Sequence, residues 1–186
     1  MEKIIFLDMD GVIIKEKTHL YKAKDIELIP GAEEAIKLLN EANYRIVVVT
    51  NRSVVARGLC TFQEVLALHE NVKDILREEG SVIDQIYFCP HHPTEGTNPQ
   101  YTRDCECRKP KIGMLLEESR NLGKSLESSF VIGDKTSDIK TGENAECKTI
   151  LLETGYGGKD GLYPDVIPTF TSKNLYDAVL NVVLRE

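Results

Sequence analysis

Three short, mostly apolar segments of this chain each stop abruptly at polar residues that can take part in chemistry. They are residues 4–7, followed by Asp8 and Asp10, residues 46–49, followed by Thr50 and Asn51, and residues 129–132, followed by Asp134. Short, continuous apolar runs are typical of strands that are buried on both faces of a parallel sheet. Ligands of such sheets bind at the carboxyl ends of the strands. The sequence therefore predicts a parallel sheet whose functional side chains lie along one edge.

Helical patterns separate these segments. Helices are expected over residues 32–43 and over 53–79, with a break near 68–71. A further helix begins at 111, another follows the third strand end and runs to about 145, and a terminal helix begins at about 173. Further strands are expected at 83–88 and 148–152. Strands that alternate with helices, without hairpins, predict an α/β fold with a doubly wound parallel sheet. No repeat or linker divides the chain, so we expect a single domain over residues 1–186.

The composition excludes several classes of function. The 186 residues include 23 Lys and Arg against 30 Asp and Glu, and the net charge of -7 repels phosphate backbones and anionic lipids. No apolar run approaches the roughly 20 residues of a membrane span, and no export signal precedes the first strand. We therefore expect a cytoplasmic monomer that has no nucleic-acid or membrane partner and acts on a small molecule.

Residues 89–109 have no helical or alternating pattern, and a structureless loop of this length needs another source of order. The loop contains Cys and His residues in the number and softness that suit a closed tetrahedral Zn²⁺ site. The predicted ligands are Cys89, His91, Cys105 and Cys107. We therefore expect a structural zinc and a zinc-stapled loop over about 89–107. His92 competes with His91 for one position, and separate thiols or a redox pair are the alternatives.

The other two of the five cysteines, Cys60 and Cys147, fall within predicted regular elements. Cysteine behaves as a small apolar residue in such positions. We expect both to belong to the core.

Paired carboxylates follow the first strand. Asp8 and Asp10 are two residues apart, so in extended backbone their side chains point the same way and repel each other unless a cation or a proton intervenes. Asp134 and Asp138 follow another strand of the same sheet and can converge on the same cation, with the oxygen ligands that Mg²⁺ prefers. An ordinary polar turn is the alternative. A calcium loop is excluded, because Ile13 stands where that loop requires glycine.

Groups that can hold phosphoryl oxygens are expected at the same edge of the sheet. They are Thr50 and Asn51 after the second segment, and Arg108 and Lys109 directly after Cys107, the last of the predicted zinc ligands. Hydroxyl, amide and cationic groups bind and stabilise phosphoryl oxygens. With a carboxylate nucleophile and a cation nearby, they predict phosphoryl transfer.

These residues resemble the four motifs of the haloacid dehalogenase (HAD) superfamily, in the right order and nearly end to end. The motifs are residues 6–12, residues 49–51, Lys109 and residues 131–138. The resemblance implies a phosphatase in which Asp8 attacks phosphorus and forms an aspartyl-phosphate. Asp10 would protonate the leaving oxygen and later deprotonate the hydrolytic water.

The same resemblance implies a metal site and a phosphoryl site. Mg²⁺ would be held by Asp8, by the backbone carbonyl of Asp10 and by Asp134, while Thr50 and Lys109 would bind the transferring phosphoryl group. Asp138 has two interpretations, as a residue behind the metal ligands or as an acidic residue at a helix N-terminus.

The cysteine loop narrows the resemblance. Residues 89–93 and 105–110 are similar to those of the D-glycero-D-manno-heptose 1,7-bisphosphate phosphatases, and less closely to those of the histidinol-phosphate phosphatases. This similarity implies that His91 is the zinc ligand, that Arg108 recognises substrate and that Lys135 contacts it. The expected reaction removes the C7 phosphate of the heptose bisphosphate, a small phosphorylated sugar. Histidinol phosphate is the alternative substrate.

Spacing predicts a capless, Rossmannoid form of this fold. About forty residues separate Asp10 from Thr50, and one helix with its approach occupies most of them, so no lid domain fits there. Specificity is then expected to come from short loops over an open site.

The sequence departs from the heptose bisphosphate phosphatases at three places. Met9 stands where the family usually has Arg, Arg52 where it has Gln, and residues 17–19 where a Lys-Gly-Tyr-like substrate loop is common. Arg52, like Asn51, is assigned to substrate binding, with a solvated turn residue as the alternative. Among other classes, a receiver-like phosphoacceptor domain also uses acidic strand ends, a Thr or Ser and a Lys. A polynucleotide 3'-phosphatase would need a basic stripe that this chain lacks.

Overall fold

The computed structural model describes residues 3–17 and 19–186, so Thr18 of the predicted substrate loop lies outside the described residues. Its six strands form one parallel sheet in the order β3-β2-β1-β4-β5-β6. The strands are β1 (Ile4–Leu7), β2 (Arg45–Asn51), β3 (Gln85–Cys89), β4 (Phe130–Gly133), β5 (Lys148–Leu152) and β6 (Phe170–Ser172). Because β1 lies between β2 and β4, the three predicted polar strand ends are neighbours.

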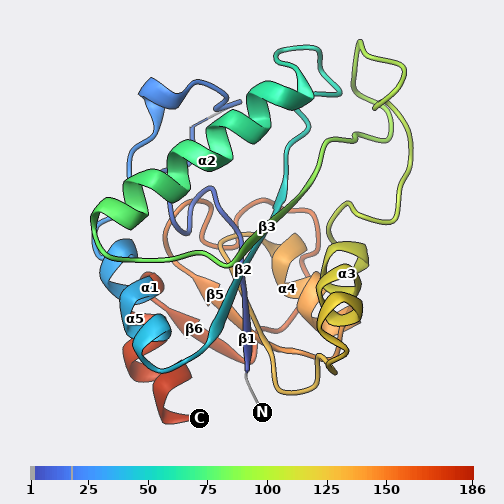
Figure 1. Cartoon of the computed structure of the whole chain (residues 1–186). Helices are drawn as coiled ribbons and strands as arrows, with labels where there is room; N and C mark the ends of the chain where they lie inside the picture. The colour runs from blue at the N-terminus through green and yellow to red at the C-terminus, as the bar shows by residue number, and fades with distance from the viewer. Residues whose placement is uncertain (1–2, 18) are drawn as a thin grey trace.

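Helices cover both faces of the sheet, so the predicted doubly wound α/β fold is confirmed. They are α1 (Ala32–Glu41), α2 (Phe62–Glu78), α3 (Gly113–Leu122), α4 (Thr136–Asn144) and α5 (Leu175–Asn181), with 3₁₀ turns at Ala23–Asp25 and Val183–Arg185. In Figure 1, α1 and α5 lie on one side of the sheet, and α3 and α4 lie on the other.

Alternate residues of β1 supply the two halves of the core. Ile5 and Leu7 pack in the cluster that includes residues of α1 and α5, whereas Ile4 and Phe6 pack in the cluster that includes Met114 of α3. This alternation is the two-residue period of a strand with helices on both sides. The strand is therefore fully buried, and its carboxyl end is held firmly.

The helix predicted over residues 53–79 is wrong at its start and in its break. Helix α2 begins at Phe62, because the side chain of Thr61 accepts a hydrogen bond from the Glu64 amide while the Glu64 carboxylate accepts one from the Thr61 amide. This capping box fixes the N-terminus later than apolar spacing alone suggests. The helix runs unbroken through residues 68–71, where the His69 ring is buried edge-on against Phe88.

The described segments between strands contain no lid domain, as the capless prediction requires. Residues 8–17 and 19–31 form turns, isolated bridges and one 3₁₀ turn, and residues 90–112 form the cysteine loop. The short edge strand β6 was not predicted, because three residues are too few to give a periodic signal. No helix among the described residues is long and apolar enough to cross a membrane.

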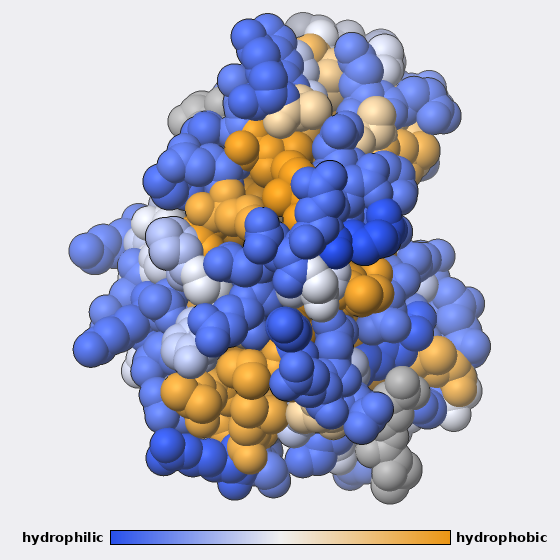
Figure 2. All heavy atoms as spheres, turned by 60° about the vertical axis from the view of Figure 1, so that its left-hand side comes forward, coloured by the Kyte–Doolittle hydropathy of each residue, from blue (hydrophilic) through white to orange (hydrophobic). Residues whose placement is uncertain are grey.

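The outer surface on the side of α1 and α5 is mixed in character. Figure 2 shows several separate apolar areas there, with hydrophilic side chains between them. Single exposed apolar residues are normal on protein surfaces.

Candidate active site

Three buried carboxylates meet at the carboxyl ends of β1 and β4. The side chains of Asp8, Asp134 and Asp138, here called the carboxylate cluster, each offer an oxygen, and these oxygens lie within 4.8 Å of one another. Oδ2 of Asp134 accepts a hydrogen bond from the Tyr156 amide at 2.7 Å, whereas its Oδ1 is buried without a hydrogen-bond partner. A buried oxygen left in this way, among like charges, suits a divalent cation.

The pKa values of the cluster reflect crowding of negative charge. Burial and the nearby charge of Asp8 raise the pKa of Asp134 to about 8. Burial also raises the pKa of Asp138, although Lys109 opposes this effect. Burial disfavours the ionised form of Asp8 too, but the charges of Lys109 and Lys135, together with hydrogen bonds from Lys109 and the Met9 amide, outweigh it and lower the pKa of that carboxyl. The pKa values of Asp134 and Asp138 stay raised despite these two ammonium groups, and a bound cation would complete the balance.

Two glycines make room for the Asp134 carboxylate. Both Gly11 and Gly155 have positive φ, at +80° and +58°. A Cβ atom at Gly11 would lie 2.2 Å from Asp134 Oδ2, and one at Gly155 would lie 2.1 Å from the same oxygen. Because no side chain fits at these distances, the turn after β1 and the turn after β5 close on Asp134 from two directions.

Lys109 is the cation inside the carboxylate cluster. Its Nζ lies 3.0 Å from Asp8 and 2.6 Å from Asp138, and its side chain is 3% exposed. Burial lowers the pKa of Lys109, but Asp138 and Asp8 outweigh it and raise that pKa, so the ammonium stays charged. Thr50, the other predicted phosphoryl ligand, is buried near the end of the neighbouring strand β2.

Asn51, predicted to bind substrate, is engaged with the main chain of Lys109. Its Oδ1 accepts a hydrogen bond from the Lys109 amide at 3.1 Å, and its Nδ2 donates one to the Lys109 carbonyl at 3.3 Å. This two-sided contact joins β2 to the segment that follows the cysteines. Sequence reasoning missed this contact, because nothing local relates residues 51 and 109.

Asp10 lies beside the carboxylate cluster and is paired with Arg52. The Nη1 atom of Arg52 is 2.9 Å from Asp10 Oδ2. Arg52 is only 4% exposed, so the alternative of a solvated turn residue is wrong, and its assignment to substrate binding stays a prediction. Burial raises the pKa of Asp10, while the charge of Arg52 opposes that rise. Among the Mg²⁺ ligands predicted, Asp10 contributes no side-chain oxygen to the cluster.

The structure shows Asp138 at a helix N-terminus, and its position behind the metal ligands stays a prediction. Its Oδ2 accepts a hydrogen bond from the Lys135 amide at the start of α4, while its Oδ1 faces Lys109. A carboxylate at this position also interacts favourably with the helix N-terminus. Asp138 thus connects the start of α4 with the cluster.

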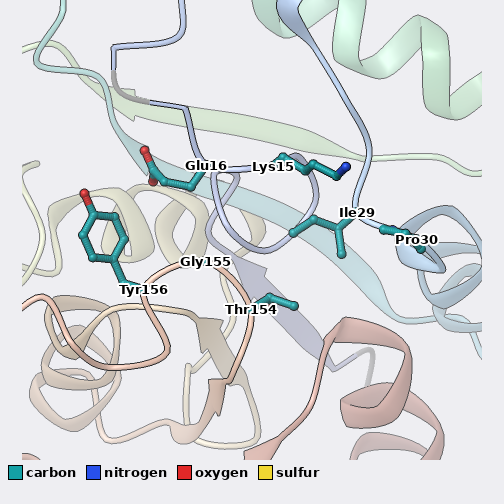
Figure 3. Close-up of a pocket in the computed structure, with 7 residues that line it drawn as sticks. All are labelled: Lys15, Glu16, Ile29, Pro30, Thr154, Gly155 and Tyr156. Atoms are coloured by element: carbon teal, nitrogen blue, oxygen red, sulfur yellow. The ribbon is translucent and has the colours of Figure 1, made fainter.

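A pocket of about 500 Å³ opens beside the cluster. Figure 3 shows Glu16 and Tyr156 at one end, Ile29 and Pro30 at the other, and Gly155 between them. Lys135, predicted to contact substrate, forms an ion pair with Glu16 at 2.9 Å and lies 4.8 Å from the centre of the Tyr156 ring.

Most of the residues that line this pocket were missed by sequence reasoning. They come from the segment after β1 and are Lys15, Glu16, Ile29 and Pro30. No motif contains these four residues, and only the fold brings them next to Thr154, Gly155 and Tyr156 of the segment after β5. Lys15 is itself paired with Glu27.

The four predicted zinc ligands also meet. Cys89, His91, Cys105 and Cys107, here called the thiol cluster, each offer a ligand atom within 4.8 Å of the others. The Sγ atoms of Cys89 and Cys107 each lie 3.5 Å from Sγ of Cys105, and Nδ1 of His91 lies 3.4 Å from Cys107 Sγ. Tetrahedral Zn²⁺ with Zn–S distances of about 2.3 Å spaces its sulfurs about 3.8 Å apart, so the cluster can hold a metal ion.

The competing histidine is used elsewhere. Nδ1 of His92 accepts a hydrogen bond from the Glu95 amide at 2.8 Å and so closes a turn of the loop. Nη1 of Arg108 donates a hydrogen bond to the His91 carbonyl at 3.0 Å. The thiol cluster is thus linked to the segment that carries Arg108 and Lys109. Of the remaining cysteines, Cys147 is buried as expected, and Cys60 is half-buried.

Two models of related hydrolase families each match one part of the chain. The model of the haloacid dehalogenase-like hydrolases matches residues 5–75, and an HAD-hydrolase-like model matches residues 106–178. The first match contains Asp8 and Thr50, and the second contains Lys109 and Asp134.

Relatives match over most of the chain. The D-glycero-beta-D-manno-heptose-1,7-bisphosphate 7-phosphatase of Pasteurella multocida is 40% identical over 83% of this chain and 84% of its own length. A D-glycero-alpha-D-manno-heptose-1,7-bisphosphate 7-phosphatase of Photorhabdus laumondii is 36% identical over 83% and 84%.

A solved structure agrees with these relatives. The crystal structure of the D,D-heptose 1,7-bisphosphate phosphatase from B. bronchiseptica, complexed with magnesium and phosphate, matches with a TM-score of 0.85 and 30% identity over 99% of both chains. Sequence, fold and the placement of the acidic strand ends lead to one conclusion. The chain belongs to the heptose 1,7-bisphosphate phosphatase family of HAD hydrolases.

Proposed function

We propose that this phosphatase removes the 7-phosphate of D-glycero-D-manno-heptose 1,7-bisphosphate. The observation that carries the proposal is the convergence of Asp8 and Asp134 beside Lys109, next to a pocket of about 500 Å³ whose lining residues Gly155 and Tyr156 contact Asp134. The relatives named for this activity cover most of the chain and support it. A phosphoacceptor signalling domain gains no such support.

Asp8 acts as the nucleophile. One of its carboxylate oxygens attacks phosphorus and forms an aspartyl-phosphate, and the ester P–O bond breaks with its electron pair on the sugar oxygen. Asp10 supplies the proton that this oxygen takes up. Water then attacks phosphorus, and Asp10 accepts its proton. The bond between Asp8 and phosphorus breaks, which regenerates the Asp8 carboxylate and releases inorganic phosphate.

The cationic and hydroxyl groups around the nucleophile bind the phosphoryl group. Lys109 is charged and fixed by Asp8 and Asp138, and Thr50 lies near the end of the adjacent strand. Groups that are fixed before the reaction stabilise developing charge without reorganisation. Asn51 holds the backbone of Lys109 in place.

Asp8, Asp134 and the backbone carbonyl of Asp10 would hold Mg²⁺. When bound, Mg²⁺ neutralises the charge between the nucleophile and the anionic substrate. Oδ1 of buried Asp134, which has no hydrogen-bond partner and has its nearest cation, Lys135, at 4.0 Å, fits this assignment. The thiol cluster would hold a structural Zn²⁺ that orders the loop ahead of Lys109.

Lys135, Arg108 and the pocket residues would bind the sugar and its second phosphate. The Lys135 ammonium contacts Glu16 and Tyr156, two residues that line the pocket. Because relatives act on both the alpha and the beta anomers, both are candidate substrates. We further propose that residues 1–186 act as a monomeric, cytoplasmic, single-domain enzyme.

Phosphate release with Mg²⁺ present tests the proposal. The panel contains both anomers of the heptose 1,7-bisphosphate, sugar monophosphates and histidinol phosphate, and ³¹P NMR identifies the phosphate that is lost. We expect the highest kcat/KM for a heptose bisphosphate, with loss of the C7 phosphate over many cycles. A preference for histidinol phosphate would overturn the substrate assignment.

A further inference from the structure

Arg52 is a buried cation that the predicted motifs do not explain. It follows β2 directly, and its side chain is 4% exposed. A buried guanidinium is costly unless its donors are paired. Its Nη1 donates to the Leu20 carbonyl at 3.4 Å and to Asp10, and its Nη2 lies 2.8 Å from the Met9 sulfur.

Both carboxylate oxygens of Asp10 face the same nitrogen. Nη1 of Arg52 lies 3.2 Å from Oδ1 and 2.9 Å from Oδ2. A contact with both oxygens restrains the position and the rotation of the carboxyl group. The planar, rigid guanidinium suits this task better than a flexible ammonium.

Arg52 is itself anchored by its main chain. Its amide donates to the Cys89 carbonyl at 2.7 Å, and its carbonyl accepts from the Val55 amide at 3.3 Å. The end of β3 and the turn after β2 therefore fix the base of the side chain. The guanidinium contacts Met9 and Asp10 and so holds the segment after β1 in place.

We propose that Arg52 is a positioning residue that holds the Asp10 carboxyl group in line with the leaving oxygen of the substrate. The inference rests on the proposed function, in which Asp10 transfers that proton. Proton transfer needs heavy atoms within about 2.6–3.2 Å, and a misplacement of about 1 Å can cost about 100-fold in rate. Arg52 then acts through Asp10, and the substrate does not touch it.

The leaving group of the substrate distinguishes this role from others. A sugar alkoxide needs a proton as it departs, whereas 2,4-dinitrophenolate departs without one. We therefore expect Arg52→Gln to lower kcat/KM about 100-fold for the sugar bisphosphate and less than tenfold for 2,4-dinitrophenyl phosphate. Because kcat/KM covers only the steps up to departure of the leaving group, later hydrolysis does not confuse the comparison.

The ratio of the two kcat/KM values is measured on one sample, so the fraction of folded protein cancels. Arg52→Lys keeps the positive charge but replaces the planar guanidinium with a flexible ammonium. It should restore part of the parent ratio of kcat/KM values. Arg57→Gln is the matched control, because Arg57 belongs to the same turn and pairs with Glu95 at the surface. This control should leave the ratio at the parent value.

Three results would overturn the proposal. An equal loss for both esters, which leaves the ratio unchanged, would give Arg52 a general structural role. Parent values of kcat/KM for both esters would give it no role in the reaction, and a raised KM with unchanged kcat for the bisphosphate alone would make it a substrate ligand. Failure of the proposed function is seen separately, as a parent enzyme that hydrolyses 2,4-dinitrophenyl phosphate but not the heptose bisphosphate.

Discussion

The carboxylate cluster and the thiol cluster are assembled in opposite ways. Each member of the first follows a strand or begins a helix, and the Asp8 amide is hydrogen-bonded to the Ile132 carbonyl of the neighbouring strand. In the second, Cys89 ends a strand, but the other three ligands lie in a loop without helix or strand. The sheet thus arranges the first cluster by itself, whereas we expect the second to depend on the proposed metal ion for its conformation.

Replacing the nucleophile should have the largest effect and test the carboxylate cluster alone. Asp8→Asn should lower kcat by about 10⁴-fold or more, because an amide cannot form the aspartyl-phosphate. The variant should remain folded, because Lys109 keeps its ion pair with Asp138, and thermal unfolding checks this. Asp74→Asn, at an exposed ion pair on α2, is the control. Turnover near the parent level would remove Asp8 as the nucleophile.

Breaking the thiol cluster should reduce activity through structure. Cys107→Ser should lose bound zinc, expose the amides of residues 90–109 to hydrogen exchange and lower kcat by about 100-fold, because Lys109 lies two residues beyond the lost ligand. Metal content by mass spectrometry and exchange rates measure these changes, and Cys60→Ser is the matched control. Full zinc content with parent kinetics would show that the loop does not need this ligand.

The contact between the two regions can be tested separately from either metal. Asn51→Ala removes both hydrogen bonds to the Lys109 main chain and should lower kcat by about tenfold, while zinc content stays unchanged. Asn51→Asp keeps the oxygen that accepts from the Lys109 amide and should recover part of the rate. Loss of zinc in Asn51→Ala would mean that the two hydrogen bonds between Asn51 and the Lys109 main chain, the Asn51 clamp, stabilise the thiol cluster as well.

Acid should lower the free energy of unfolding through His69, which packs against Phe88 of β3, and this effect on activity should be the smallest of the four. Burial lowers the pKa of His69 to about 3, from 6.5 in the unfolded chain, so the folded state binds fewer protons between these values. Stability therefore falls as pH decreases below 6.5, by about 2 kcal/mol from pH 7 to pH 5. Denaturant unfolding at both pH values measures this slope.

His69→Leu should remove that part of the pH dependence, whereas His19→Gln, at an exposed position, should keep it. An equal slope in His69→Leu and in the parent protein would place the acid sensitivity elsewhere.

The sequence predicted those features that depend on short, local patterns. The buried strands and their polar ends follow from apolar runs, and Cys89, His91, Cys105 and Cys107 follow from ligand type and spacing. Strand order then brought Asp8 and Asp134 together, as expected for parallel neighbours.

Features that depend on distant contacts were missed or misjudged. Burial of Arg52 depends on Leu20 and Asp10, and the Asn51 clamp depends on a partner 58 residues away. The start of α2 was misplaced because one capping box outweighs a longer apolar pattern. Periodicity reports which face a residue occupies, and it contains no information on its partners.

Gly155 has a consequence for how this enzyme can diversify. It touches the Asp134 carboxylate, while its neighbours Thr154 and Tyr156 line the pocket. Three consecutive residues thus line the pocket, and two of them, Gly155 and Tyr156 through its amide, also contact Asp134. Insertions or deletions here would displace Asp134, so new substrate preferences can arise in this turn by side-chain exchange at fixed length.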